Sequence, residues 1–139
     1  KLKDIAKDTL VGAGKYLIND MSFINKLNQC EIEVQALEFV ELRIFSALSA
    51  GQRVGAESSI LKCRGTELQQ KIQELSVEAI GYWSTPFIYD TFANINEPSI
   101  GPDYAMTIAP AYFNGRKTTI YAGSNEIQRN IISKAVLGL

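Results

Sequence analysis

The residues of this sequence that could do chemistry gather in a short turn before its last helix. The turn reads Tyr121, Ala122, Gly123, Ser124, and Glu126 follows it. Ser124 is a good helix N-cap, and Glu126 places a carboxylate in the first helical turn, where it complements the positive end of the helix dipole. The free backbone N–H groups of a helix N-terminus also suit an anionic phosphate. An anion-binding turn and an ordinary solvated cap are the two interpretations.

Histidine is absent from the chain. A Ser-His-Asp triad, a Cys-His dyad, an HExxH zinc site and a histidine general base are therefore excluded within it. The two cysteines, Cys30 and Cys63, are too few and too far apart for a CxxC metal or redox pair. We interpret each as a small buried hydrophobe, the alternatives being a disulfide partner or a reactive thiol. No metal site is expected.

Composition favours one ordinary domain. The chain has 139 residues, of which 46% are hydrophobic, enough to bury a core. Its 14 basic and 15 acidic residues give a net charge of -1, so neither nucleic acid nor a membrane surface is favoured as a partner. No apolar run approaches the roughly 20 residues that span a bilayer, and no signal segment opens the chain. We expect a cytoplasmic protein without membrane insertion.

Apolar spacing predicts two long helices. After Ser22 as a possible N-cap, apolar residues recur in steps of three and four at Phe23, Leu27, Cys30, Val34 and Leu37, and again, one step of seven later, at Ile44 and Leu48. Gly51 and Gly55 mark the end of this helix. The second runs from about Ser58 to Gly81, with one face formed by Leu61, Gly65, Leu68, Ile72, Leu75 and Ala79. The short connection predicts that the two helices are antiparallel, and Gly65 predicts close approach of a neighbouring backbone.

The two ends of the chain complete the fold prediction. Ile127, Ile131 and Ala135 recur at helical spacing, with Gly138 as the stop. Apolar residues near the start predict a further helix from about Lys1, broken at Gly12 and Gly14. Between residues 84 and 115, Pro86, Pro98 and Pro110 predict a long ordered loop with helical turns near 87–92 and before Arg116. The predicted fold is all-α, an up-and-down bundle of four main helices.

Three further groups of side chains have two interpretations each. Glu41 interrupts the apolar seam and could be catalytic, but we favour an ion pair at a helix or subunit contact, with Arg43 and Arg53 nearby. Tyr82, Trp83 and Phe87 could line a pocket, although aromatic residues at a helix end are more often core. Arg116 and Lys117 could hold an anionic coenzyme A or an acyl carboxylate, or they form a solvated face.

Three segments resemble the acyl-CoA dehydrogenase superfamily. The tail TTIYAGSNEIQRNIISKAVLGL, residues 118–139, resembles the end of these enzymes, and SSILKCRGTELQQKIQELSVEAIG, residues 58–81, resembles their helix with a small-small-x-x-Lys start. The segment PSIGPDYAMTIAPAYFN, residues 98–114, is most similar to the large subunit of pimeloyl-CoA dehydrogenase. The resemblance implies that residues 1–139 are the C-terminal helical domain of a longer enzyme, most of whose flavin and substrate contacts lie in upstream domains.

The same resemblance implies FAD as cofactor and alpha,beta-dehydrogenation of an acyl-CoA, as in fatty acid metabolism. It places Tyr121, Ala122 and Gly123 at the substrate, and Gly123, Ser124 and Glu126 at the flavin. Glu78 and Gly81 match residues that touch the flavin adenine end of a neighbouring subunit, although the family has Gln where this chain has Glu78. Many members carry their catalytic glutamate where this chain has Ala122, which cannot accept a proton.

No catalytic residue is therefore assigned within the chain, and the isolated chain is expected to be inactive. Some members of the superfamily place the base on an earlier helix, which would lie upstream. The resemblance also implies a homo- or hetero-oligomer. The alternative function is a non-catalytic assembly domain or a degenerate subunit that has lost the base.

Overall fold

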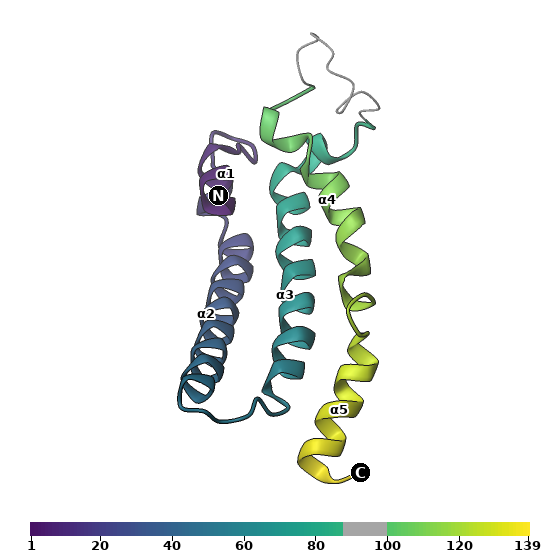
Figure 1. Ribbon diagram of the computed structural model, residues 1–139. Helices are drawn as coiled ribbons and strands as arrows, with labels where there is room; N and C mark the ends of the chain where they lie inside the picture. Colours follow the sequence, from purple (N-terminus) through teal and green to yellow (C-terminus); the bar gives the residue numbers. More distant parts are fainter. Residues whose placement is uncertain (88–99) are drawn as a thin grey trace. The chain divides into compact units, whose positions relative to one another are not determined.

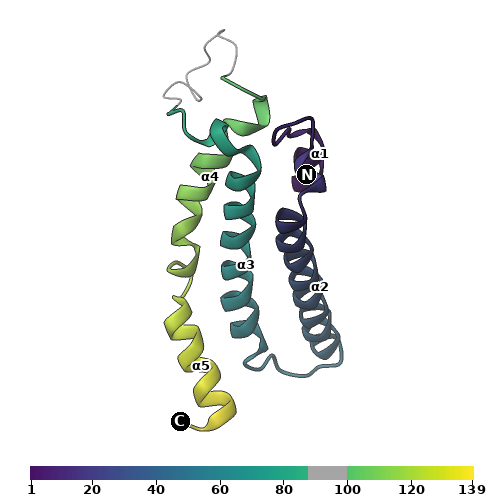
Figure 2. The same cartoon turned by 180° about the vertical axis from the view of Figure 1, so that it is seen from behind.

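The computed structural model describes residues 1–87 and 100–139, and this part of the chain is all helical (Figures 1 and 2). The α-helices are α1 (Leu2–Asp8), α2 (Met21–Ser49), α3 (Glu57–Ile80), α4 (Ile108–Gly115) and α5 (Asn125–Leu137). Short 3-10 turns are η1 (Leu17–Asn19), η2 (Gly81–Ser84), η3 (Asp103–Ala105) and η4 (Arg116–Thr119). The described residues contain no strand, only an isolated bridge between Leu10 and Tyr16. The predicted all-α class is confirmed.

The chain divides into two compact units. The first comprises Lys1–Leu27 and Ile72–Gly115, and the second comprises Asn28–Lys71 and Arg116–Leu139. In the first unit, Lys26 near the start of α2 pairs with Glu78 near the end of α3 at 2.8 Å. In the second unit, Glu33 of α2 pairs with Lys71 of α3 at 2.7 Å. One ion pair thus joins α2 to α3 within each unit. In the second unit, which contains their short connection, α2 and α3 run antiparallel as predicted (Figure 1).

Each unit has its own buried residues. In the first unit they include Phe23 and Leu27 of α2, and Leu75, Ala79 and Ile80 of α3. In the second unit the buried apolar residues are Cys30, Cys63 and Leu68. Both cysteines are free and buried, as predicted, and burial raises the pKa of the Cys30 thiol.

The predicted seam of α2 is only partly buried. Phe23, Leu27 and Cys30 are buried, but Val34 is 44% exposed and Leu48 is 46% exposed. The sequence pattern was correct about the helix and wrong about this part of its burial. Gly65 of α3 gives a related correction, because a Cβ built there would meet no atom within 4 Å in the described structure. The predicted close approach of a backbone at Gly65 is therefore wrong for this part of the chain.

The loop predicted between residues 84 and 115 contains more helix than expected. It holds η3 and the eight-residue helix α4, and Pro110 is the third residue of α4. Proline is tolerated there because the first N–H groups of a helix have no intrahelical acceptor. Of the turn predicted near 87–92, residues 88–92 lie outside the described residues, and Phe87 lies in no helix.

Helix α2 begins one residue before the predicted cap. Ser22 lies inside its first turn, and Asp20 caps the helix: its Oδ1 accepts a hydrogen bond from the Phe23 N–H at 2.9 Å. The Asp20 carbonyl also accepts the Ile24 N–H at 2.9 Å, as an N-cap carbonyl does. The cap residue is therefore Asp20, not Ser22.

We expect Asp20→Ala to lower the free energy of unfolding by about 0.5–2 kcal/mol, because one N-terminal N–H loses its acceptor. Ser22→Ala is the matched control, with an expected effect within about 0.5 kcal/mol. Denaturant unfolding followed by circular dichroism measures both. Equal effects of the two substitutions would contradict the assignment of the cap.

Candidate functional site

The candidate turn has an unusual backbone conformation. The N–H groups of Ile120 and Tyr121 both donate to the Lys117 carbonyl, at 3.0 and 3.2 Å, and close the end of η4. Ala122 and Gly123 then follow with φ values of 55° and 82°. A left-handed conformation costs a non-glycine residue about 1–2 kcal/mol, so the surroundings must hold Ala122 in place.

Partly buried hydrogen bonds attach both ends of this turn to α3. Lys62 Nζ donates to the Thr118 carbonyl at 3.1 Å and to Asn125 Oδ1 at 2.9 Å. Thr66 Oγ1 lies 3.2 Å from the same Asn125 oxygen. Thr118 and Asn125 are each only 3% exposed. A single ammonium group therefore bridges Thr118 in η4, shortly before the turn, and Asn125, the first residue of α5.

Two further residue pairs join the segment from η4 to α5 to helix α3. Gln70 Nε2 donates to the Arg116 carbonyl at 3.1 Å, and Arg116 Nη2 donates to the Gln70 carbonyl at 3.2 Å. Arg129 of α5 pairs with Glu67 at 2.6 Å. These bonds correct the interpretation of Arg116, because its guanidinium holds the backbone of α3 and is only partly exposed. Lys117 is exposed, as the solvated-face interpretation expects.

Ser124 caps α5 as predicted. Its Oγ accepts the Ile127 N–H at 3.5 Å, and Gly138 ends the helix with a φ of 71°. Hydrogen bonds from its own backbone N–H and from the Ser124 hydroxyl keep the pKa of Glu126 below its usual value. An ionised Glu126 at this helix end repels a second anion and is a weak base, so it does not replace the carboxylate missing at position 122.

The predicted substrate-contacting residues form an exposed surface. Tyr121 is 51% exposed, and Ala122 and Gly123 are exposed as well. The φ of 82° favours glycine at position 123, while a Cβ built there would lie 2.6 Å from Gln128 Nε2, the end of a flexible side chain that can move away. The structure brings together Tyr121, Ala122, Gly123, Ser124 and Glu126 in the second unit.

Glu78 and Gly81, the other predicted flavin contacts, belong to the first unit. Glu78 is held by Lys26, whose Nζ reaches both carboxylate oxygens at 2.8 and 3.0 Å. Gly81 has a φ of 51° where α3 passes into η2. The Glu78 carboxylate thus has a structural partner of its own, in an exposed pair of a kind that stabilises folds by about 0–1 kcal/mol.

The aromatic residues after α3 are not core. Tyr82 is 80% exposed, Trp83 is 41% exposed and Phe87 is 89% exposed, so the preferred interpretation is wrong. Part of the Trp83 ring lies against Gly101, where a Cβ would come within 2.5 Å. Tyr82 and Trp83 lie within η2, and Phe87 follows it.

Glu41 is exposed and makes no ion pair with any of the described residues, so the favoured ion pair is not found within this part of the chain. It lies beside a groove between α2 and α3 that Leu61, Gly65 and Leu68 also line. The exposed position of this carboxylate does not favour the catalytic interpretation. A contact between Glu41 and another subunit stays a prediction.

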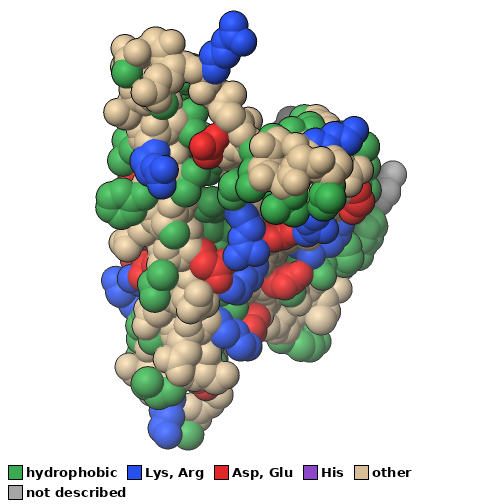
Figure 3. All heavy atoms as spheres, turned by 90° about the horizontal axis from the view of Figure 1, so that it is seen from below, with side chains coloured by type: hydrophobic (Ala, Val, Ile, Leu, Met, Phe, Trp, Pro, Cys, Tyr) green, Lys and Arg blue, Asp and Glu red, His purple; other side chains and the backbone are tan. Residues whose placement is uncertain are grey.

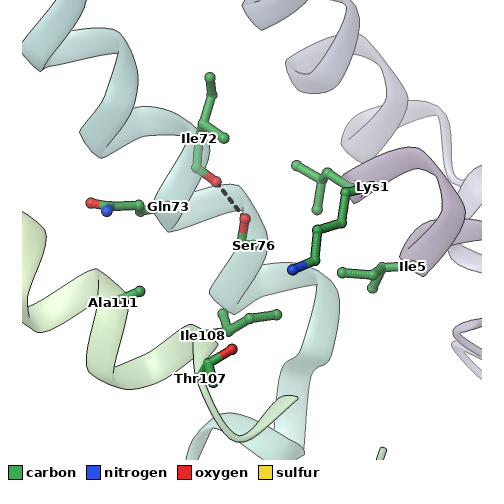
Figure 4. Close-up of a pocket in the computed structure, with 9 residues that line it drawn as sticks. Lys1, Ile5, Ile72, Gln73, Ser76, Thr107, Ile108 and Ala111 are labelled. Atoms are coloured by element: carbon green, nitrogen blue, oxygen red, sulfur yellow. Dashed lines mark hydrogen bonds between the residues drawn. The ribbon is translucent and has the colours of Figure 1, made fainter. Parts of the chain in front are cut away.

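A cavity of about 260 Å³ lies in the first unit, between α1, α3 and α4 (Figure 4). Ile5, Ile72 and Ile108 give it apolar walls, and the Ser76 hydroxyl at its edge donates to the Ile72 carbonyl at 2.8 Å. None of the residues predicted to bind cofactor or substrate lines it. The cavity and the candidate turn therefore have no residue in common.

The described residues contain neither a metal-site cluster nor a membrane-spanning helix. Residues 1–87 and 100–139 contain no cluster of three or more His, Cys, Asp and Glu side chains with metal-site geometry. Across that part of the chain, no helix combines the length and the apolar character of a membrane span. Lys, Arg, Asp and Glu side chains are interspersed on the face shown in Figure 3.

The polar contacts of α3 were not singled out by sequence. Lys62, Thr66 and Gln70 recur every four residues, which places them on one face of a helix. Such a stripe of hydrogen-bonding side chains was the available signal. It could not identify Asn125 and Thr118 as partners, because these lie far away in the sequence.

We expect Lys62→Met to lower the free energy of unfolding by about 1–3 kcal/mol, because it removes the shared donor of two buried acceptors. Lysine and methionine have similar helix propensities, so the helix itself should be unaffected. Lys117→Met, at an exposed position, is the control, with an expected change within about 0.5 kcal/mol. If chemical denaturation finds the two variants equally stable, the bridging role of Lys62 is wrong.

Comparison with known proteins supports the family that the sequence around the turn resembles. Residues 6–137 match the family described as acyl-CoA dehydrogenase, C-terminal domain. A chain of the ChsE4-ChsE5 complex from Mycobacterium tuberculosis is similar in structure, with a TM-score of 0.74 and 25% sequence identity. That match covers 99% of this chain and 33% of the other, so this chain spans about a third of its relative's length. The comparison with curated proteins gave no match. Because the family match extends over nearly the whole sequence, the chain belongs to the acyl-CoA dehydrogenase C-terminal domain family.

Proposed function

We propose that this chain is the C-terminal domain of an FAD-dependent acyl-CoA dehydrogenase that converts an acyl-CoA thioester to its alpha,beta-unsaturated form. The observation that carries the proposal is the exposed left-handed turn at Ala122 and Gly123, fixed to α3 by Lys62 and Asn125. A costly backbone conformation, held by hydrogen bonds to buried residues and presented on the surface, is typical of a functional site. The turn also lies where the family resemblance places flavin and thioester.

The turn suits the neutral part of a flavin better than its pyrophosphate. Gly123 presents backbone without a side chain, and Ser124 adds a hydroxyl at the start of α5. The ionised carboxylate of Glu126 at the same helix end disfavours a nearby phosphate. Tyr121, Ala122 and Gly123 would contact the thioester. Glu78 and Gly81 would contact the adenine end of a neighbouring subunit's FAD. For this contact, Glu78 would either keep its ion pair with Lys26 or exchange it for a contact with the FAD.

FAD supplies the acceptor for the beta hydride in this reaction. The alpha proton requires a positioned base, and Ala122 cannot be that base. We place the base on an upstream helix of the complete enzyme, because a turn that no longer meets a flavin would have little reason to keep its strained geometry. The chain would work with the enzyme's upstream domains and in a homo- or hetero-oligomer, and we propose a cytoplasmic location for the complex.

A second function is favoured by Ala122 and by the Lys26–Glu78 pair. Loss of the usual carboxylate, and use of Glu78 in a structural ion pair, are what a non-catalytic assembly domain would show. Such a subunit would keep the helices for oligomerisation while another chain carried out the chemistry. For the subtype we propose the pimeloyl-CoA dehydrogenase large subunit, on the resemblance of residues 98–114.

The two functions predict different effects of Ala122→Glu in the full-length protein. With an upstream base, the wild type should reduce dye with a suitable acyl-CoA, and Ala122→Glu should bring little gain or crowd the site. With no base present, the wild type should be inert, and Ala122→Glu should gain up to about 10²- to 10⁴-fold. The 139-residue chain alone should be colourless and inactive in either case.

Ala122→Gln is the matched control, because glutamine has the size of glutamate but cannot accept the proton. Both substitutions also face the same left-handed backbone, so strain affects them equally. A gain with Glu that Gln does not reproduce identifies a restored base. Strong wild-type activity would exclude the assembly-only function, while a gain confined to Ala122→Glu on an inert wild type would contradict the upstream base.

A further inference from the structure

Helix α4 ends in an asparagine followed by a glycine. Asn114 is the last residue but one of the helix, and Gly115 is the last. The Asn114 side chain is exposed, whereas Gly115 is buried. Of all the asparagines in the sequence, Asn114 alone precedes a glycine. Because glycine has no Cβ to shield its backbone nitrogen, an asparagine side chain approaches this nitrogen more closely than it approaches that of a larger residue.

We propose that Asn114 is a site of deamidation, at which its side chain reacts with the backbone of Gly115 at a rate that helix α4 controls. The Gly115 nitrogen attacks Cγ of Asn114, and the new C–N bond closes a five-membered succinimide ring. The Cγ–Nδ2 bond breaks, and the side-chain nitrogen leaves as ammonia with the proton of the Gly115 N–H. Water then opens the ring at either carbonyl and gives aspartate or isoaspartate.

The helical backbone of α4 opposes this reaction. In an α-helix each N–H after the first turn donates to the carbonyl four residues earlier, which for Gly115 is the carbonyl of Ala111. Ring closure rotates the Asn114 backbone out of the helical range and breaks this hydrogen bond. The end of α4 must therefore open before Asn114 can react.

Packing within the first unit adds to the protection. The side-chain amide of Gln73 in α3 lies against Gly115, in the space that a Cβ would occupy, and its Oε1 is buried. The end of α4 is thus packed on α3. Helix ends still open locally at a lower free energy than the whole fold, so the reaction proceeds without global unfolding. Compared with an unstructured peptide, we expect deamidation to be slowed at least about tenfold.

Either product changes the end of α4. Aspartate adds one negative charge at the C-terminus of the helix, which the helix dipole disfavours. Isoaspartate also adds one carbon atom to the main chain, which interrupts the helical hydrogen bonds. The modified chain should therefore be less stable than the original. This reaction is independent of the proposed dehydrogenase function, because neither flavin nor acyl-CoA takes part.

Mass spectrometry after incubation tests the site and its control by α4. The chain and a peptide of residues 108–120 should be kept at neutral pH and body temperature, and the products at each asparagine quantified after proteolysis. Asn114 should react at least about tenfold more slowly in the folded chain than in the peptide, yet before Asn125 and Asn130, which precede larger residues. In urea that unfolds the chain, the two rates should become equal. Asn114→Gln should remove the signal.

Matched glycine substitutions separate local opening from global unfolding. Ala111→Gly loosens α4, and the lower helix propensity of glycine should make deamidation of Asn114 about four- to fivefold faster. Ala36→Gly makes the same change in α2 and should leave the rate nearly unchanged. Both alanines are exposed, so neither substitution opens a buried cavity.

The proposal is wrong if Asn114 stays intact in the folded chain throughout a long incubation, or if other asparagines react before it. Equal rates in the folded chain and the peptide would show that α4 does not control the reaction. Equal acceleration by the two glycine variants would also overturn the proposal, because the reaction would then require unfolding of the whole chain. No acceleration by Ala111→Gly would exclude opening of α4 as the controlling step.

Discussion

The ammonium group of Lys62 is the contact on which the candidate site depends. It bridges the Thr118 carbonyl and the Asn125 side chain, at the two ends of the turn. Hydrogen bonds from a charged donor are stronger than neutral ones, and a buried amide that loses its partner costs about 1–3 kcal/mol. Registers of α5 that remove Asn125 from Lys62 are therefore penalised. The strained conformation of Ala122 follows from this fixed spacing between the two ends.

Helix α3 is the support that makes this contact possible. Its residues Cys63 and Leu68 are buried, and Lys62, Thr66 and Gln70 meet the segment around η4 and α5. The ion pair between Glu33 and Lys71 joins α3 to α2. The hydrogen bond between these two side chains lowers the pKa of the Glu33 carboxyl and raises the pKa of the Lys71 ammonium group. The turn is thus presented by a helix that is itself held on two sides.

Local features of the fold could be predicted from the sequence, because they depend on nearby residues. Helical spacing gave both long helices, and Ser124 and Gly138 gave the ends of α5. Burial could not be read in the same way. The pattern that contains Val34 and Leu48 indicates a face that avoids water but not what covers it, and both are exposed within the described chain. The close approach predicted at Gly65 and the surface role predicted for Arg116 were wrong for the same reason, because spacing in the sequence does not identify a distant partner.

A double-mutant cycle on Lys62 and Asn125 tests the central claim most directly, because it isolates their interaction from the cost of each substitution. Lys62→Met, Asn125→Ala and the double variant should be compared by denaturant unfolding. If the two side chains hold the turn together, the double variant should lose less stability than the sum of the single variants, with a coupling of about 0.5–3 kcal/mol. Losses that add within about 0.3 kcal/mol would show that the two residues act independently, and would contradict the account of how the turn is held.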